Sequence, residues 1–328
     1  MPEIDVQLMD LIKTSGWGNS NIFPLRSDAS LRRYFRLKRN SETVILMDAR
    51  LTNKKETDYF YKISAYLISH NFRCPKVYFY NRDKGIMIIE DFGNNLFSRV
   101  LLKDPQRSKE LYLLATDTLI SLRKVPLPDW LTETQNIELC QNLSPFFDFF
   151  LPKYPEFLWM KDTIIQSIKR KLDANLGKNK NVICLRDCHF ENLILIPKER
   201  GPKSVGIIDF QDASLMHPAY DLVSILQDAR CEVPLETETT LLRYYMKRTE
   251  VNSTQFLKAY RILGLQRNLR ILGVFYKLSI SNDKKRYMAY VPRVISYIER
   301  HLIKTLENKT ADMFQEMFNV VKIKLNQG

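Results

Sequence analysis

The stretch VICLRDCHFENLILIPKERGPKSVGIIDFQD, residues 182–212, decides the fold of this chain. Short apolar runs alternate in it with polar residues. Asp187 follows the run VICL, Asn192 comes five residues later, and Asp209 ends the run VGII. The pattern predicts a strand, a polar loop, a short strand, a turn and a final short strand. Each polar residue alone is typical of an ordinary turn, but the three together, beside apolar runs, favour a functional site.

The spacing of these three residues has a chemical use. Phosphoryl transfer needs a carboxylate that orients the attacking hydroxyl and accepts its proton, and oxygen ligands that hold Mg²⁺ on the nucleotide phosphates. Carboxylate and amide oxygens suit Mg²⁺ because it is a hard cation. A base Asp, an Asn five residues on and a second Asp after a short hairpin match the kinase catalytic-loop spacing. We therefore expect Asp187 to be the base, and Asn192 and Asp209 to hold the metal.

Length and composition indicate a globular protein with two lobes. The chain has 328 residues, too many for one ordinary small core, and its 45% hydrophobic and 27% charged residues are typical of globular proteins. The formal net charge is +13, but the Lys and Arg residues are scattered. A solvated surface or a phosphorylated ligand is therefore favoured over nucleic acid. The composition indicates no obligate protein partner.

Cysteine usage and hydropathy indicate a soluble, cytoplasmic protein. Five cysteines occur, an odd number with no C-x-x-C pair, which argues against a disulfide framework or a zinc site. Cys184 and Cys188 flank the expected base, and we expect both to be small buried packing groups. The N-terminal residues do not resemble a signal peptide, and no apolar run approaches the ~20 residues that span a bilayer.

The first part of the chain predicts an antiparallel sheet. A short helix over residues 3–15 precedes two strands joined by a tight turn at residues 27–30, and further strands follow at 44–47, 75–80 and 85–90. Two strands joined by a turn of small residues can lay backbone N–H groups over phosphates. An ordinary hairpin fits these residues equally well.

The helix expected over residues 54–70 places Glu56 in its first turn, where an acid suits the helix dipole. In a kinase, a Glu of this helix pairs with a strand Lys that holds the phosphates. Met47 stands where that Lys would be expected. A surface Glu that only complements the helix end is the simpler interpretation of Glu56. One of three arginines could supply the missing charge: Arg32, Arg33 or Arg36.

The segment Glu90–Asp91–Phe92–Gly93 is expected to be a hinge whose main chain binds the adenine. We therefore predict a nucleotide-binding lobe over residues 1–92 and a catalytic and acceptor-binding lobe over 93–328. The second lobe is expected to be mainly helical, with an aromatic core segment at 139–151. Its helices are expected at 109–125, 159–176, 218–230, 236–248, 253–277, 289–306 and 310–325.

Polar residues inside the helical part are further candidates. Asp221 lies in a first helical turn, where it can accept backbone N–H bonds, and we expect it to brace the catalytic loop. Asp228 and Arg230 stand at the end of the same helix and could face a cleft or solvent, with solvent the simpler interpretation. Three consecutive polar residues, 266–268, interrupt an apolar helix and predict a polar pocket wall.

These segments together resemble the aminoglycoside phosphotransferase/choline kinase family. The likeness rests on LRDCHFEN at 185–192, GIIDFQDA at 206–213 and HPAYDLVSILQDAR at 217–230. The flanking segments SDASLRRYFRL at 27–37 and LQRNLRILGVFYKL at 265–278 are similar to the bacterial branch that phosphorylates the anomeric hydroxyl of N-acetylmuramate and N-acetylglucosamine in cell-wall recycling. The resemblance implies an α+β, protein-kinase-like two-lobed fold, with a small antiparallel-sheet N-lobe and a larger mainly helical C-lobe. It also implies ATP and Mg²⁺ as cofactors.

The resemblance also assigns roles to residues. Asp187 matches the catalytic base, Asn192 and Asp209 match the Mg²⁺ ligands, and His189 matches the His of the motif D-x-H-x-x-N. We place the nucleotide at Ser27, Asp28, Ser30, Arg33, Glu56, Glu90 and Phe92, and the acceptor at Arg186, His189, Asp212, Asp228, Arg230 and Arg267.

The chain departs from the family pattern at three positions. Leu185 replaces a His that often begins the catalytic motif, Gln211 replaces the Gly after the metal-binding Asp, and Met47 replaces the strand Lys. The first two positions are outside the ligand set. The third leaves open which residue anchors the nucleotide phosphates.

Two other functions fit the same residues. An aminoglycoside or choline-type kinase would need an acidic acceptor pocket, whereas the helices after Asp212 carry many Arg and Lys that suit an acidic or neutral acceptor. A nucleotide-binding pseudokinase would explain the missing strand Lys. Retention of all three catalytic residues argues against it, because a scaffold does not need them.

Overall fold

The chain divides into two compact units. The first, here called the sheet unit, contains Met1–Ala115 and Phe190–Ala213, and the second, the helical unit, contains Thr116–His189 and Ser214–Gly328. The computed structural model describes residues 5–25, 31–177, 181–280 and 282–327. The sequence predicts a different kind of division, between a nucleotide-binding lobe and a catalytic lobe at residues 92 and 93. That boundary stays a prediction.

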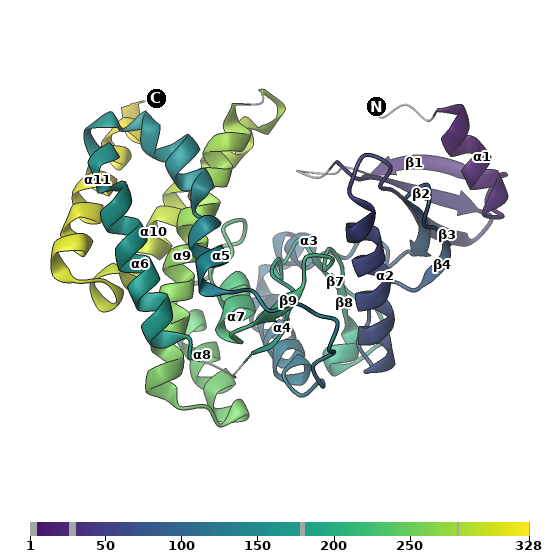
Figure 1. Cartoon of the computed structure of the whole chain (residues 1–328). Helices are drawn as coiled ribbons and strands as arrows, with labels where there is room; N and C mark the ends of the chain where they lie inside the picture. The colour runs from purple at the N-terminus through teal and green to yellow at the C-terminus, as the bar shows by residue number, and fades with distance from the viewer. Residues whose placement is uncertain (1–4, 26–30, 178–180, 281, 328) are drawn as a thin grey trace. The chain divides into compact units, whose positions relative to one another are not determined.

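The sheet unit contains a five-stranded antiparallel sheet in the order β1-β2-β3-β5-β4 (Figure 1). Asn40 connects β2 to β3 with a φ of 54°, a left-handed conformation that Asn tolerates in tight turns. Each predicted strand of this region is present. The strands are β1 (Asn21–Leu25), β2 (Arg33–Arg39), β3 (Glu42–Asp48), β4 (Val77–Asn81) and β5 (Ile86–Glu90).

Alternating side chains give the sheet two apolar faces. Helix α1 (Val6–Thr14) covers one face through a cluster that includes Leu8, Phe35 and Leu46. Asp5 begins this helix, because its Oδ1 accepts the Leu8 N–H at 2.8 Å. Helix α2 (Lys54–Ser69) lies on the other side of the sheet from α1 (Figure 1).

A small hairpin in the sheet unit carries two of the predicted site residues. It consists of β7 (Leu193–Leu195) and β8 (Val205–Ile207), which pair antiparallel as predicted. Main-chain bonds fix the hairpin to earlier parts of the unit: Ile207 N–H donates to Arg73 at 2.8 Å, and Leu195 N–H donates to Asn95 at 2.8 Å. The residues just before and after its strands are therefore held firmly.

Two further helices follow the sheet. Helix α3 (Phe97–Lys103) belongs to the sheet unit, and a short 3-10 turn (Pro105–Arg107) leads into α4 (Ser108–Leu122), which belongs to the sheet unit as far as Ala115. Phe190, which precedes the hairpin, stacks on Tyr112 of α4 with ring centres 4.3 Å apart. The ring of Phe97, in α3, contacts the Phe190 ring edge-on.

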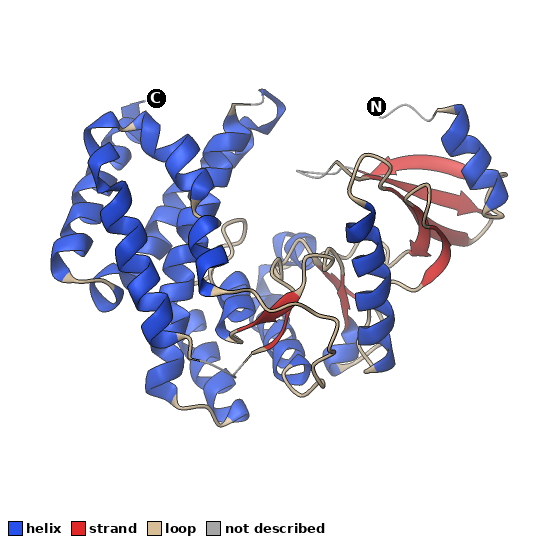
Figure 2. Cartoon of the chain, viewed as in Figure 1, coloured by secondary structure: helices blue, strands red, loops and turns tan. Residues whose placement is uncertain are grey.

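The helical unit is built almost entirely of helices, as Figure 2 shows. Its one described strand pair joins β6 (Val182–Cys184) to β9 (Ser214–Met216). The longest helix, α9, is buried along most of its length and packs on α6, α7 and α10. The helices are α5 (Asn136–Gln141), α6 (Lys161–Asn175), α7 (Ala219–Leu226), α8 (Leu235–Thr249), α9 (Ser253–Ser279), α10 (Val291–Thr305) and α11 (Asn308–Gln327).

One sequence expectation needs correction here. The helix expected to reach about Arg230 ends at Leu226, because Gln227 leaves the helical conformation and Asp228 closes a turn by accepting the Arg230 N–H at 2.9 Å.

The aromatic segment 139–151 contributes Phe146, Phe147 and Phe150 to the core, as expected. It contains the end of α5, Pro145 and then a π-helical turn at Phe146–Phe150.

Within the described part of the chain, no helix combines the length and apolar character that crossing a membrane requires.

Candidate active site

The β7–β8 hairpin brings Asn192 and Asp209 together in the sheet unit. The Asn192 Nδ2 lies 3.4 Å from Asp209 Oδ2, and the Ile208 N–H donates to the Asn192 carbonyl at 3.1 Å. Asp209 has a φ of 59°, a left-handed conformation that is uncommon outside glycine and frequent at functional sites. Two residues that are 17 positions apart in sequence therefore present their side chains at one place.

The donors at this place fit Mg²⁺. Asp209 supplies a carboxylate and Asn192 an amide oxygen, both of the hard type that Mg²⁺ prefers. Gln211 Nε2 donates to Asp209 Oδ1 at 3.1 Å. The Gln211 Oε1 is buried and has no hydrogen-bond partner among the described residues. A buried acceptor without a donor is rare in proteins, and a hydrated cation would supply one.

Arg32 is the cation that lies beside Asp209. Its guanidinium is 3.9 Å from Asp209 Oδ1, and the residue is only 8% exposed. Burial raises the pKa of Tyr34 to about 12, and the charges of Arg32, Asp209 and Glu56 act on the same hydroxyl. Arg32, Tyr34, Glu56 and Asp209 thus share one neighbourhood. Met47, in the expected position of the strand Lys, is buried and apolar.

The other two candidate arginines of β2 pair with other carboxylates. Arg33 Nε donates to Asp48 Oδ2 at 2.9 Å, and Arg36 binds both oxygens of Asp91 at 2.6 and 2.9 Å. Arg33, which also lies 3.7 Å from Asp5 before α1, belongs to the predicted nucleotide set, and that role stays a prediction. Arg32, one of the three arginines that the sequence offers, lies 3.9 Å from Asp209 Oδ1, and its role toward the nucleotide stays a prediction.

The remaining predicted nucleotide residues fall into two groups. Glu90 and Phe92 both contact Arg73: Glu90 Oε1 accepts from its guanidinium at 2.9 Å, and the Phe92 ring lies 5.0 Å beneath it. These contacts order the predicted hinge after β5. The predicted phosphate turn, with Ser27, Asp28 and Ser30, lies outside the described residues.

Asp221 braces the catalytic loop in the helical unit, as predicted. Its two carboxylate oxygens accept the Leu185 N–H at 2.6 Å and the Arg186 N–H at 2.9 Å. Arg186 has a φ of 70°, so the chain turns sharply just before Asp187. Burial raises the pKa of Asp221 to about 7. Both carboxylate oxygens accept N–H groups, so a proton on either oxygen would face a donor and find no acceptor. These bonds favour the ionised form, and we take Asp221 as ionised at neutral pH.

Positive charges surround Asp187, the expected base. Burial opposes ionisation of its carboxyl, but the charges of His189, Arg267, Arg270 and Arg186 outweigh it and lower the pKa of Asp187. Burial lowers the pKa of His189 to about 4, so at neutral pH its ring is uncharged and does not contribute to this effect. The arginines are then the positive charges that remain beside the Asp187 carboxyl.

Most of the predicted acceptor residues gather around Asp187. The charges of Asp228, Arg230 and Arg267 all act on His189, which is itself buried. The simpler interpretation, that Asp228 faces solvent, was wrong, since Asp228 is only 1% exposed. Asp212 is exposed and belongs to the sheet unit. Sequence reasoning missed Arg270, although its position three residues after Arg267 was a usable signal.

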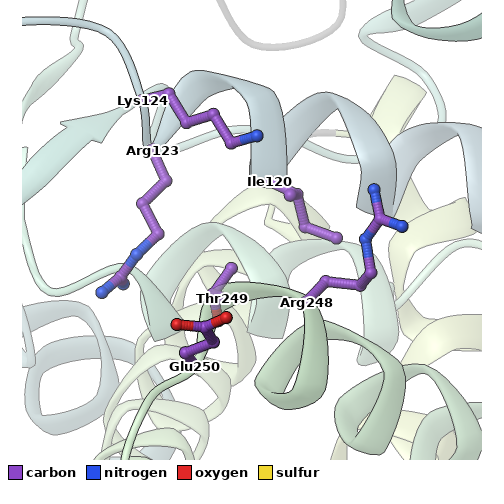
Figure 3. A pocket seen from close by; sticks show the side chains of 6 residues that line it. All are labelled: Ile120, Arg123, Lys124, Arg248, Thr249 and Glu250. Carbon is purple, nitrogen blue, oxygen red and sulfur yellow. The ribbon is translucent and has the colours of Figure 1, made fainter.

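A separate pocket of about 220 Å³ contains none of these residues (Figure 3). Arg123 and Lys124 follow the last residue of α4, and Arg248 lies in the last turn of α8. Cations at helix C-termini complement the free carbonyls and the helix dipole. This structural role accounts for the basic lining, and we do not place the active site there. The lining residues are Ile120, Arg123, Lys124, Arg248, Thr249 and Glu250.

Comparison with known proteins shows which proteins the chain as a whole resembles. The model of a phosphotransferase enzyme family matches residues 21–254 of the chain. An N-acetylmuramate/N-acetylglucosamine kinase from Caulobacter vibrioides is 30% identical, and the match covers 88% of this chain and 89% of that protein.

Solved structures show the same fold. Choline kinase LicA from Streptococcus pneumoniae matches with a TM-score of 0.64 and 16% identity, over 89% of this chain and 99% of that one. An ADP-bound aminoglycoside phosphotransferase matches with a TM-score of 0.59 and 16% identity, over 94% of this chain and 99% of that one. These likenesses confirm the predicted α+β, protein-kinase-like fold class.

Proposed function

Because the chain belongs to the phosphotransferase enzyme family, we propose that it transfers a phosphoryl group from ATP to the anomeric hydroxyl of N-acetylmuramate or N-acetylglucosamine. The observation that carries the proposal is the anchored turn before Asp187: Asp221 accepts the Leu185 and Arg186 N–H groups at 2.6 and 2.9 Å and so fixes the chain where the resemblance places the base. The Caulobacter relative supports the acceptor. A location in the cytoplasm and a role in cell-wall recycling stay predictions.

Each residue has a definite task in this reaction. Asp187 accepts the proton of the sugar hydroxyl while the hydroxyl oxygen bonds to the γ-phosphorus and the bond to the departing ADP oxygen breaks. Asp221 holds the main chain of Leu185 and Arg186, and so fixes the direction of Asp187. Asn192 and Asp209 would hold Mg²⁺, which neutralises charge on the phosphates. Arg32 would add positive charge where the strand Lys is absent.

Charged residues near Asp187 and near Asp209 argue against the two alternative functions. Choline and aminoglycosides are cations, and the arginines around Asp187 would repel them. A neutral or anionic acceptor meets no such barrier. The pseudokinase alternative rested on the missing strand Lys, and Arg32 beside Asp209 offers a replacement cation.

A panel of acceptors tests this proposal. We expect the wild-type protein with Mg²⁺ and ATP to release ADP when N-acetylmuramate or N-acetylglucosamine is present, and not with choline or kanamycin. Asp187→Asn should lower kcat by about 100-fold to 10,000-fold, because the base is lost, with an unchanged circular dichroism spectrum. Release with choline or kanamycin alone would contradict the acceptor, and full turnover by Asp187→Asn would remove Asp187 from the base role.

A further inference from the structure

Arg267 of α9 is a charged residue that is buried in the helical unit. The residue is 3% exposed, and within the described residues its guanidinium makes no hydrogen bond and no ion pair. Its Nε in particular is fully buried and unsatisfied. A buried guanidinium is costly unless an anion pairs with it. An unpaired arginine inside a folded protein therefore points to an anionic ligand.

Arg270 extends the same positive surface toward solvent. It lies three residues after Arg267, so the two side chains are neighbours on one face of α9. Arg270 is half-buried and also has no hydrogen bond or ion pair with a described residue. The charges of both arginines act on the Asp187 carboxyl, so the pair lies close to the expected base within the helical unit.

Arginines are prominent among the charges near the base. The charges of Arg186, Arg267 and Arg270 act on the Asp187 carboxyl, and the charge of Arg230 acts on His189. A bound carboxylate would satisfy the buried guanidinium of Arg267.

We propose that Arg267 and Arg270 together bind a carboxylate of the acceptor, which makes the preferred substrate an amino sugar that carries an acidic side group. The inference rests on the proposed function and assigns it an acceptor class. N-acetylmuramate carries a lactyl carboxylate, and N-acetylglucosamine has a hydroxyl at the same position. The planar guanidinium fork matches a carboxylate with two parallel hydrogen bonds.

A purely structural role for the two arginines is the competing explanation. In that case they would only offset the negative charges of Asp187 and Asp221, and every acceptor would depend on them equally. If the arginines bind the carboxylate, in contrast, their loss lowers the preference for N-acetylmuramate over N-acetylglucosamine. The ratio of their specificity constants separates the two explanations, with turnover of N-acetylglucosamine as the internal reference.

The test uses Arg270→Gln, since Arg270 is half-buried and its replacement leaves no cavity in the core. Arg261→Gln is the matched control, because it also removes one positive charge from α9. Arg261 lies nine residues before Arg270, and this separation puts the two side chains on opposite faces of the helix. We expect Arg270→Gln to lower the ratio of kcat/KM for N-acetylmuramate over N-acetylglucosamine by about tenfold or more, the worth of a hydrogen bond to a charged group. Arg261→Gln should leave the ratio unchanged.

Direct binding provides a second readout. Isothermal titration with N-acetylmuramate should show the same loss of affinity for Arg270→Gln, and Arg267→Lys, which keeps the charge but not the fork, should lower affinity as well. An equal fall of activity on both sugars, or an unchanged ratio, would overturn the inference and leave the proposed function standing. Failure of the wild-type protein to phosphorylate either sugar would overturn the proposed function and this inference with it.

Discussion

Arg32 is, at the residue scale, the side chain that we propose as the replacement for a missing group. Protein kinases place a Lys on a strand to hold the nucleotide phosphates, and here that position is the buried Met47. Arg32 directly precedes β2, and its guanidinium lies 3.9 Å from Asp209 Oδ1. A buried guanidinium beside the expected metal ligand can supply the positive charge that the strand does not.

We therefore expect Arg32→Gln to weaken the binding of Mg-ADP by about tenfold or more. Lys38→Gln, an exposed residue of β2, is the control and should bind the nucleotide as the wild type does. Titration calorimetry measures both affinities. Equal affinity of wild type and Arg32→Gln would show that another residue anchors the phosphates.

From the sequence, the expected site residues are easier to identify than their burial and their neighbours in the folded chain. Asp187, Asn192 and Asp209 are recognisable because their spacing is set by a short hairpin and loop. Burial depends on distant segments, which explains why Asp228 appeared solvent-facing and proves buried. The choice of Arg32 over Arg33 has the same cause, since it depends on which carboxylates the folded chain places nearby.

Helix α9 organises the helical unit at the scale of elements, and a single glycine allows it. A Cβ atom on Gly273 would overlap the backbone of Pro145 and Phe146. The π-helical turn at Phe146–Phe150 therefore packs directly on the backbone of α9. Backbone atoms cannot rotate away as a flexible side chain can, so a larger residue at this position must displace one element.

We expect Gly273→Ala to lower the free energy of unfolding by about 3 kcal/mol, at the upper end of the overpacking range. Gly177→Ala is the control, since it meets no atom within 4 Å and has a φ of 60°. Its cost should be only the left-handed strain of about 1–2 kcal/mol. Urea denaturation of the purified variants gives both values, and equal losses would contradict close packing at Gly273.

Most elements follow from local sequence, and the exceptions have physical reasons. The helices and strands with clear periodicity appear within a few residues of their expected bounds. Helix α7 stops early because Gln227 turns into a buried polar network, where its Oε1 accepts from Asn268 at 2.6 Å and its Nε2 donates to Glu238 at 3.1 Å. Partners 11 and 41 residues away cannot be inferred from the helix itself.

Two units carry the proposed chemistry at the scale of the whole molecule. Asn192 and Asp209 belong to the sheet unit with Arg32, whereas Asp187 belongs to the helical unit with Asp221 and the arginines. The metal and nucleotide functions are thus assigned to one unit, and proton acceptance and acceptor choice to the other. The net charge of +13 is spread over both, and it says less about function than the few arginines near Asp187.

The central claim is transfer to the anomeric hydroxyl of an amino sugar, and ³¹P NMR of the reaction products tests it most directly. With Mg-ATP and N-acetylmuramate, the account predicts a new sugar 1-phosphate signal that is coupled to the anomeric proton. The signal should be absent with Asp187→Asn. A phosphomonoester without that coupling would show transfer to a different hydroxyl, and the absence of any sugar phosphate from the wild-type reaction would contradict the account as a whole.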